Sequence, residues 1–173
     1  MIERIHIIIG IVLFFLLAGA AASQGLPSGW PPLTKEQEVV ALTLMGEARG
    51  EGSEGLYAVG CVIEKRVVER KLTLSKVCLQ NRMVKGRKVW QFSCWEDKRF
   101  METMKRLLKA GTKEAEYSKA LARAMTKGDL EQTYTGHANH YHADYVSPSW
   151  ADKFKPTKKI GRHYFYKLPW AIK

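Results

Sequence analysis

Acidic residues are scarce in this chain, which has 17 Asp and Glu against 28 Lys and Arg and a formal net charge of +11 over 173 residues. Such an excess of positive charge favours a polyanionic partner, namely nucleic acid, an anionic lipid surface or an acidic cell-wall polymer. The charge selects a class of partner and leaves the reaction open.

Several catalytic signatures are also missing. The sequence has no Gly-x-Ser-x-Gly elbow and no helical His-Glu-x-x-His pair. The glycine-rich segment 50–55 is not a phosphate loop, because it follows a helical pattern rather than a strand and lacks a Lys followed by Ser or Thr. Internal repeats are absent too, and an apolar content of 46% suits one domain with a real core.

The N-terminus has the layout of a secretory signal. Arg4 precedes an apolar stretch at 7–17 and a run of small residues, in which Ala20 and Ala22 suit an A-x-A cleavage site. We therefore expect residues 1–22 to direct export to the periplasm or cell envelope. The alternative is an uncleaved anchor, with residues 5–22 associated with the inner membrane.

A Pro- and Gly-rich linker follows at residues 23–33, and one folded domain is expected at 34–173. No Cys lies near Ala22, which argues against a lipid-modified N-terminus.

Only three cysteines are present. Cys78 and Cys94 flank a basic, loop-like stretch at 80–91 and are predicted to form a disulfide in an oxidising compartment, which would stabilise the fold by roughly 3 kcal/mol. Cys61 lies in an apolar pattern and is predicted to be a small buried hydrophobe. The alternative is three free thiols.

Periodicity predicts an α+β fold that is mainly helical. Thr34 and Gln37 form a capping box that begins the first helix, and residues 54–70 form a second helix with Glu64 on its outward side. Further helices are expected at 95–110 and 112–128, whereas 160–166 and part of 137–145 have the aromatic and β-branched composition of strands. The small antiparallel sheet therefore lies near the C-terminus.

Glu47 is the candidate catalytic acid. It lies at the end of the first helix, just before the glycine-rich loop, where an apolar surface can meet a cleft. Desolvation favours the protonated form of such a carboxyl, which can then give its proton to a leaving oxygen. The alternative is a last-turn carboxylate tied to Arg49, with the glycines acting only as a helix stop.

A histidine and tyrosine cluster at 137–145 permits two interpretations. His140 and His142 would project from one face of a strand, where together with a carboxylate they would suit zinc. Alternatively the strand lines a groove that holds sugar or peptide. Four more aromatic side chains are candidates either for stacking on sugars or for the core: Trp90, Phe92, Trp95 and Trp150.

Several motifs in order resemble the SleB/CwlJ-type cell wall hydrolases. The resemblance spans residues 36–167. It is carried by Leu42-Thr43-Leu44-Met45-Gly46-Glu47-Ala48-Arg49-Gly50-Glu51, Glu54-Gly55, Ala58-Val59, Val77-Cys78-Leu79-Gln80, Gln91-Phe92-Ser93-Cys94-Trp95, Ala138-Asn139-His140-Tyr141-His142, Pro148-Ser149-Trp150 and Ile160-Gly161-Arg162-His163-Tyr164-Phe165-Tyr166.

The resemblance implies a lysozyme-like domain with a glycan-binding cleft that acts on peptidoglycan. It makes Glu47 the catalytic acid of a lytic transglycosylase, which needs one carboxyl group and no cofactor. Hydrolysis with a second carboxylate, and an N-acetylmuramoyl-L-alanine amidase that uses zinc, stay open as alternatives. We expect a monomer that does not bind nucleic acid. The hypothetical substrate contacts are Phe92, Tyr141, His142 and Tyr145, with Glu51 and Glu54 as cleft carboxylates that either position sugar or hold the loop.

The chain departs from the spore enzymes of this family in a basic insertion at 83–89 and in the charged helices between Trp95 and Gly128. A general envelope enzyme or a phage lysis enzyme therefore fits as well as a spore-cortex enzyme. The rival class is a non-catalytic module that grips an anionic polymer, with Trp90 and Phe92 stacking on it. Its basic residues would be Lys85, Arg87, Lys88, Lys98 and Arg99.

Overall fold

The computed structural model describes residues 30–169, of which those from Leu33 onward belong to one compact unit. The predicted signal or anchor at 1–22 and most of the predicted linker at 23–33 lie outside the described residues and stay predictions. Within residues 30–169, no helix has the length and apolar character needed to cross a membrane.

Helix α2 (Lys35–Ala48) contacts the four other α-helices of the unit. The predicted capping box is present, because the Thr34 hydroxyl accepts from the Gln37 amide and the Gln37 side chain accepts from the Thr34 amide. Residues 40–45 are all buried, so α2 is buried on every side over this stretch rather than amphipathic. Its last turn is thereby held firmly in place.

The remaining helices surround α2. The predicted helix at 54–70 is confirmed as α3 (Gly52–Arg70), and the two charged helices are confirmed as α5 (Lys98–Ala110) and α6 (Lys113–Met125). A short helix, α4 (Leu74–Cys78), follows α3. Single turns of 3-10 helix connect these elements: η2 (Arg49–Glu51), η3 (Ser93–Trp95), η4 (Gln132–Thr135) and η5 (Ala151–Lys153).

The predicted antiparallel sheet near the C-terminus is confirmed, with strand order β3-β5-β4. Its strands are β3 (His140–Ala143), β4 (Lys158–Ile160) and β5 (His163–Tyr166). The prediction of one continuous strand at 160–166 is wrong, because Gly161 adopts a φ of +55° and turns the chain into a hairpin. The fold is therefore mainly helical, as predicted, with two small antiparallel sheets among the described residues in place of the single sheet that was expected.

The two faces of this sheet have different roles. Tyr141, His163 and Phe165 share one face, since side chains alternate along each strand and Tyr141 pairs with Phe165. Phe165 is fully buried there, in a cluster with Ala58 and Val62 of α3. The opposite face is aromatic and more open, and carries His140, His142, Tyr164 and Tyr166.

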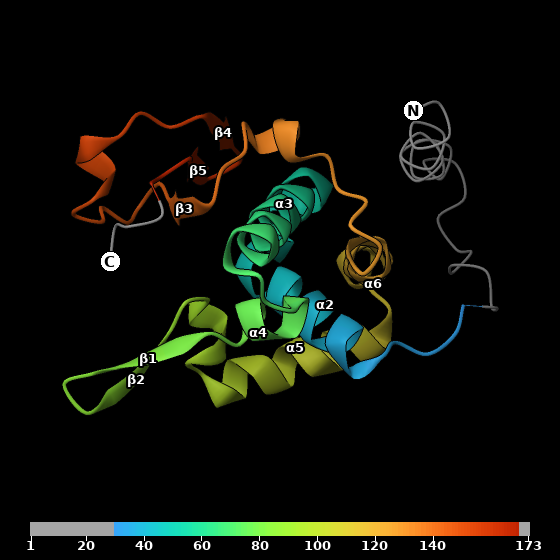
Figure 1. The fold of residues 1–173 in the computed structure, drawn as a ribbon. Coiled ribbons are helices and arrows are strands. Elements are labelled where there is room, and N and C mark those ends of the chain that lie inside the picture. Colours follow the sequence, from blue (N-terminus) through green and yellow to red (C-terminus); the bar gives the residue numbers. More distant parts are fainter. Residues whose placement is uncertain (1–29, 170–173) are drawn as a thin grey trace. The chain divides into compact units, whose positions relative to one another are not determined.

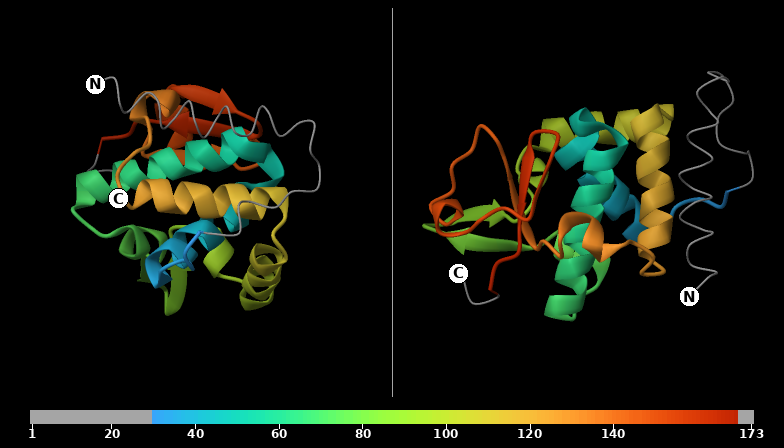
Figure 2. Two further views of the ribbon diagram at one scale, coloured as in Figure 1. Left: turned by 90° about the vertical axis from the view of Figure 1, so that its right-hand side faces the viewer. Right: turned by 90° about the horizontal axis from the view of Figure 1, so that it is seen from above.

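The predicted basic loop at 80–91 is instead a β-hairpin made of β1 (Asn81–Val84) and β2 (Arg87–Trp90). Lys85 and Gly86 both have positive φ, which is the requirement of a tight two-residue hairpin turn. A Lys-Gly turn is a weaker sequence signal than Asn-Gly, so the hairpin was missed. The hairpin and the sheet β3-β5-β4 extend from the same side of the helices (Figures 1 and 2).

The predicted disulfide between Cys78 and Cys94 is wrong, because both thiols are free and buried. The Cys94 side chain is turned toward α2, where a Cβ atom placed on Gly46 would lie 2.5 Å from Cys94 Cβ. The thiol of Cys94 is therefore packed against α2. Burial of the Cys78 thiol raises its pKa to about 12. Cys61 is fully buried, as predicted.

Glu64 was expected on the outward side of α3 but is only 7% exposed. Its carboxylate accepts a hydrogen bond of 3.3 Å from Gln132 Nε2, so η4 covers this side of the helix. Burial raises the pKa of Glu64 from 4.5 to about 7. The folded protein therefore keeps a proton on Glu64 at pH values at which the unfolded chain has released it.

This burial predicts a pH dependence of stability. Below about pH 4.5, Glu64 is protonated in both the folded and the unfolded protein. Because the folded pKa of Glu64 is raised to about 7, the contribution of this proton to stability is lost as the pH rises through 7. As the pH rises from 4.5 to 8, the unfolding free energy of Glu64→Gln relative to that of the wild type should increase by about 3 kcal/mol. Urea denaturation at both pH values measures this. An equal pH dependence in the two proteins would contradict the prediction, and Glu38→Gln, at an exposed position of α2, is the control.

Candidate active site

Glu47 lies in the last turn of α2 and is partly buried. The preceding Gly46 lets η3 approach this turn, since any side chain there would collide with Cys94. The Glu47 carboxylate is thus placed at the edge of the core, with part of its surface open to solvent.

Each oxygen of the Glu47 carboxylate accepts one hydrogen bond. The backbone amide of Cys94 donates to Oε1 over 2.9 Å, and the Tyr141 hydroxyl donates to Oε2 over 2.8 Å. Cys94 follows the β1–β2 hairpin and Tyr141 lies on β3. Glu47 is therefore the point at which the helices, the segment after the hairpin and the sheet meet.

The alternative interpretation, in which Glu47 is tied to Arg49, does not fit the structure. The Arg49 guanidinium lies 5.5 Å from the centre of the Phe100 ring, and its Nη1 contacts the Met104 sulfur at 3.5 Å. Arg49 is thus directed toward α5, and Glu47 is left with Tyr141 and Cys94 as its partners.

Burial shifts the pKa values of three groups around Glu47. Burial, followed by the negative charge of Glu47, raises the pKa of Tyr141 well above its usual value, so the hydroxyl keeps its proton. Arg66 is 5% exposed, and burial lowers its pKa to about 10, which leaves it charged at neutral pH. Burial also lowers the pKa of His163, whose ring lies 5.2 Å from that of Tyr141.

Arg66 and Asn139 form a buried contact close to Tyr141 that was not predicted from the sequence. Arg66 Nε donates to the Asn139 carbonyl over 2.8 Å, and the Arg66 guanidinium lies 5.2 Å from the centre of the Phe92 ring. One signal was available: Arg66 lies one turn after Val62, so it continues the stripe of α3 that faces the sheet.

The two other predicted carboxylates differ from Glu47. Glu51 Oε2 accepts a bond of 2.8 Å from the Arg162 amide, and no side chain fits at Gly161 because Glu51 occupies that space. Glu51 therefore connects η2 to the β4–β5 turn, which agrees with the role of holding the loop. Glu54 lies in the first turn of α3 and is exposed.

Phe92 was predicted to contact substrate, and the structure contradicts this because Phe92 is 1% exposed and belongs to the core. Trp95 is partly buried and donates from Nε1 to the Thr43 hydroxyl over 3.1 Å. The ring centres of Trp90 and Trp95 lie 6.3 Å apart, at the base of the hairpin. These aromatic side chains attach the hairpin to α2.

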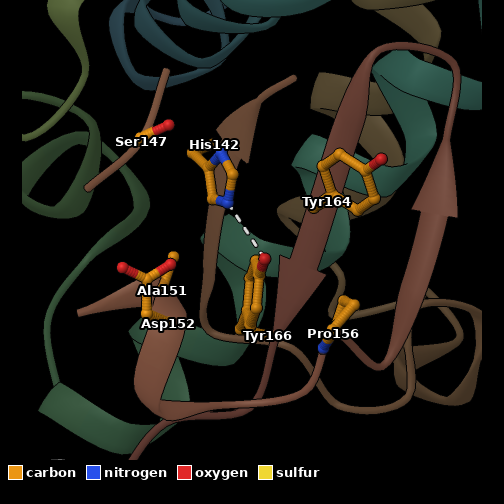
Figure 3. A pocket seen from close by; sticks show the side chains of 7 residues that line it. All are labelled: His142, Ser147, Ala151, Asp152, Pro156, Tyr164 and Tyr166. Carbon is orange, nitrogen blue, oxygen red and sulfur yellow. Dashed lines mark hydrogen bonds between the residues drawn. The ribbon is translucent and has the colours of Figure 1, made fainter. Parts of the chain in front are cut away.

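His142 and Tyr145 lie away from the face of the sheet that contacts Glu47. His142 lines a pocket of about 290 Å³, together with Tyr164, Tyr166 and residues of the segment 147–156 (Figure 3). Its ring stacks on Tyr166 at 5.3 Å and meets the edge of Trp150 at 5.7 Å. Tyr145 is 74% exposed, with Arg162 at 4.9 Å from its ring centre. Only Tyr141, of the predicted aromatic contacts, touches Glu47.

The zinc alternative used His140 and His142, which do share a face of β3. Both ring nitrogens of His142 are engaged, at 2.9 Å with the Ala143 carbonyl and at 3.0 Å with the Tyr166 hydroxyl. His140 Nδ1 lies 2.8 Å from Asn139 Oδ1. Within residues 30–169, no group of three or more His, Cys, Asp and Glu side chains has an arrangement that could hold a metal ion.

Comparisons with known proteins give two findings. A family model described as Cell Wall Hydrolase matches residues 50–166, which begin three residues after Glu47. The structure is similar to the catalytic domain of the germination-specific lytic transglycosylase SleB from Bacillus anthracis, with a TM-score of 0.55 and 26% identity over 82% of this chain and 100% of that chain. No curated protein sequence matches the chain.

Proposed function

The chain belongs to the SleB/CwlJ-type cell wall hydrolase family, and we propose that it is an exported enzyme that cleaves peptidoglycan as a lytic transglycosylase, with Glu47 as its catalytic residue. The observation that carries the proposal is the position of Glu47. This carboxylate lies at the end of a buried helix, partly open to solvent, and is oriented by Tyr141 and the Cys94 amide.

In the proposed reaction, Glu47 first donates its proton to the glycosidic oxygen between N-acetylmuramic acid and N-acetylglucosamine. The bond from muramoyl C1 to that oxygen breaks. The muramoyl 6-hydroxyl then attacks C1 and gives its proton to Glu47, which closes an anhydro ring and restores the acid. No water is consumed. The Tyr141 hydroxyl can donate to the carboxylate or accept from the acid, so it suits both forms of Glu47.

A mechanism with one carboxyl group is favoured over hydrolysis with two. A glycosidase of the usual kind needs a second carboxyl that acts as nucleophile or activates water. The nearest candidate in sequence, Glu51, is occupied by the Arg162 amide at the β4–β5 turn. Glu51 is thus committed to holding the loop.

Tyr141→Phe separates positioning from folding. The ring still packs against His163 and Phe165, but Glu47 loses a hydrogen bond to a charged group, which is worth about 1.5 kcal/mol or more. We expect kcat to fall roughly tenfold or more while KM stays close to wild type and the unfolding free energy falls by about that 1.5 kcal/mol. Tyr164→Phe, on the opposite face of the sheet, is the matched control. Equal kcat values for Tyr141→Phe and wild type would show that the hydroxyl does not orient Glu47.

The experiment that tests the proposed activity is clearing of a turbid suspension of purified peptidoglycan. We expect the chain to clear it at the same rate with and without a chelator. Loss of clearing in chelator, with recovery on addition of zinc, would favour the amidase alternative through His140 and His142. Binding without clearing would favour the non-catalytic module.

A further inference from the structure

The β1–β2 hairpin carries a concentration of positive charge. Residues 81–90 contain four basic side chains and no acidic one: Arg82, Lys85, Arg87 and Lys88. All four are exposed, and within residues 30–169 none of them forms an ion pair. This charge is therefore uncompensated by the fold.

The hairpin does not contribute to the core. Residues 81–88 are all exposed, including Met83 at 67% and Val84 at 37%. Met83 pairs with Lys88, and Val84 pairs with Arg87, on opposite faces of the ribbon. Each face thus combines a basic and an apolar side chain, which suits a ligand that is both acidic and partly apolar.

The base of the hairpin is attached beside the catalytic carboxylate. Four residues after β2 ends, the Cys94 amide donates to Glu47, and Trp95 is bonded to Thr43 of α2. Strands of four residues are about 13 Å long. One polymer can therefore lie along the hairpin and at the same time present its scissile bond to Glu47.

We propose that this hairpin binds the carboxylates of the stem peptides that hang from the glycan strand held at Glu47. The inference rests on the proposed function, since it takes peptidoglycan as the polymer. The glycan backbone is nearly neutral, whereas its stem peptides carry carboxylates and alanine methyl groups. Arg and Lys bind the carboxylates, and Met83 and Val84 contact the methyl groups.

An anionic membrane is a less suitable partner for the hairpin. A segment that lies in a membrane interface presents its apolar residues on one side and its basic residues on the other. In this ribbon Met83 and Val84 point to opposite faces, so only one of them can enter a membrane at a time.

The test measures binding without turnover. In the full chain carrying Glu47→Gln, Arg82, Lys85, Arg87 and Lys88 are replaced by Gln, and co-pelleting with purified sacculi is measured over a range of salt concentrations. The matched control changes the same formal charge at four exposed basic residues of other elements: Arg106, Lys109, Lys113 and Lys127. The same proteins are also pelleted with sacculi whose carboxylates have been converted to neutral amides.

We expect the hairpin variant to bind about tenfold more weakly than the control variant at low salt, with the difference shrinking as salt rises. Amidation of the sacculi should remove this difference. Equal binding by the two variants would overturn the inference. A hairpin variant that loses affinity for phosphatidylglycerol vesicles but binds sacculi as well as the control variant would also overturn it. Failure of the proposed function would be seen separately, as a wild-type chain that pellets with sacculi but releases no soluble fragments, or as a Glu47→Gln chain that still releases them.

Discussion

Glu47→Gln should clear a peptidoglycan suspension about 10² to 10⁴ times more slowly than the wild type, which is the usual contribution of a positioned general acid and base. The amide has the shape of the carboxyl group but cannot give or take the proton. The Gln oxygen can accept from the Cys94 amide, and the Gln NH2 group can donate to the Tyr141 hydroxyl, which also accepts, so both contacts of position 47 can remain. The initial rate of clearing measures the effect.

Two controls separate lost chemistry from lost structure. Glu38→Gln makes the same chemical change at an exposed position of α2 and should keep the wild-type rate. The Glu47→Gln chain should still pellet with sacculi and should unfold near the wild-type midpoint. Clearing at the wild-type rate by Glu47→Gln would remove Glu47 from the mechanism.

The second large effect is expected for stability, at Asn139. This residue is 1% exposed and connects the sheet to the segment after β5 through side-chain hydrogen bonds. Its Oδ1 accepts from the Leu168 amide over 2.9 Å, and its Nδ2 donates to the Leu168 carbonyl over 2.9 Å and to Glu69 over 3.1 Å. Asn139 thus joins α3, β3 and the segment after β5.

Asn139→Ala should lower the free energy of unfolding by about 4 kcal/mol, because both backbone groups of the buried Leu168 lose their partner. Urea denaturation followed by circular dichroism measures the loss. Asn81→Ala removes an exposed amide that makes one bond to Leu79 and should cost less than about 1 kcal/mol. If the two variants were equally stable, the fastening role of Asn139 would be refuted.

The sequence predicted helices α2, α5 and α6 well because each of them begins at a local capping residue. The capping box at Thr34 and the helix-starting Thr112 are both present in the structure, and Gly111 ends α5 in a left-handed conformation. These signals depend on neighbours within one turn. Distant contacts were not needed to read them.

The errors share a different cause, which is contact between distant segments. Glu64 reads as an outward residue of an amphipathic helix until η4 covers it, and the Cys78–Cys94 pair reads as a disulfide until Cys94 packs on Gly46. The aromatic residue Phe92 reads as a sugar contact until Arg66 and the core enclose it. Sequence periodicity contains no information on which segments meet.

The site shows the same division. Glu47 could be named from its place between an apolar helix and a glycine-rich loop, together with the resemblance to a family. Its partners could not, because Tyr141 and Cys94 are brought to it by tertiary packing from positions 94 and 47 residues away. His163 was missed because a buried imidazole has no distinctive spacing, whereas Arg66 offered one signal, its position one turn after Val62 on α3.

Whether Glu47 acts alone as acid and then as base is tested most directly by mass spectrometry of the muropeptides that the wild-type chain releases. The mechanism proposed for Glu47 yields glycan ends closed as anhydro rings, each one water lighter than a reducing end. Reducing ends would contradict it by requiring water and a second carboxyl group, and free stem peptides with intact glycan would contradict it by placing the cut at the amide.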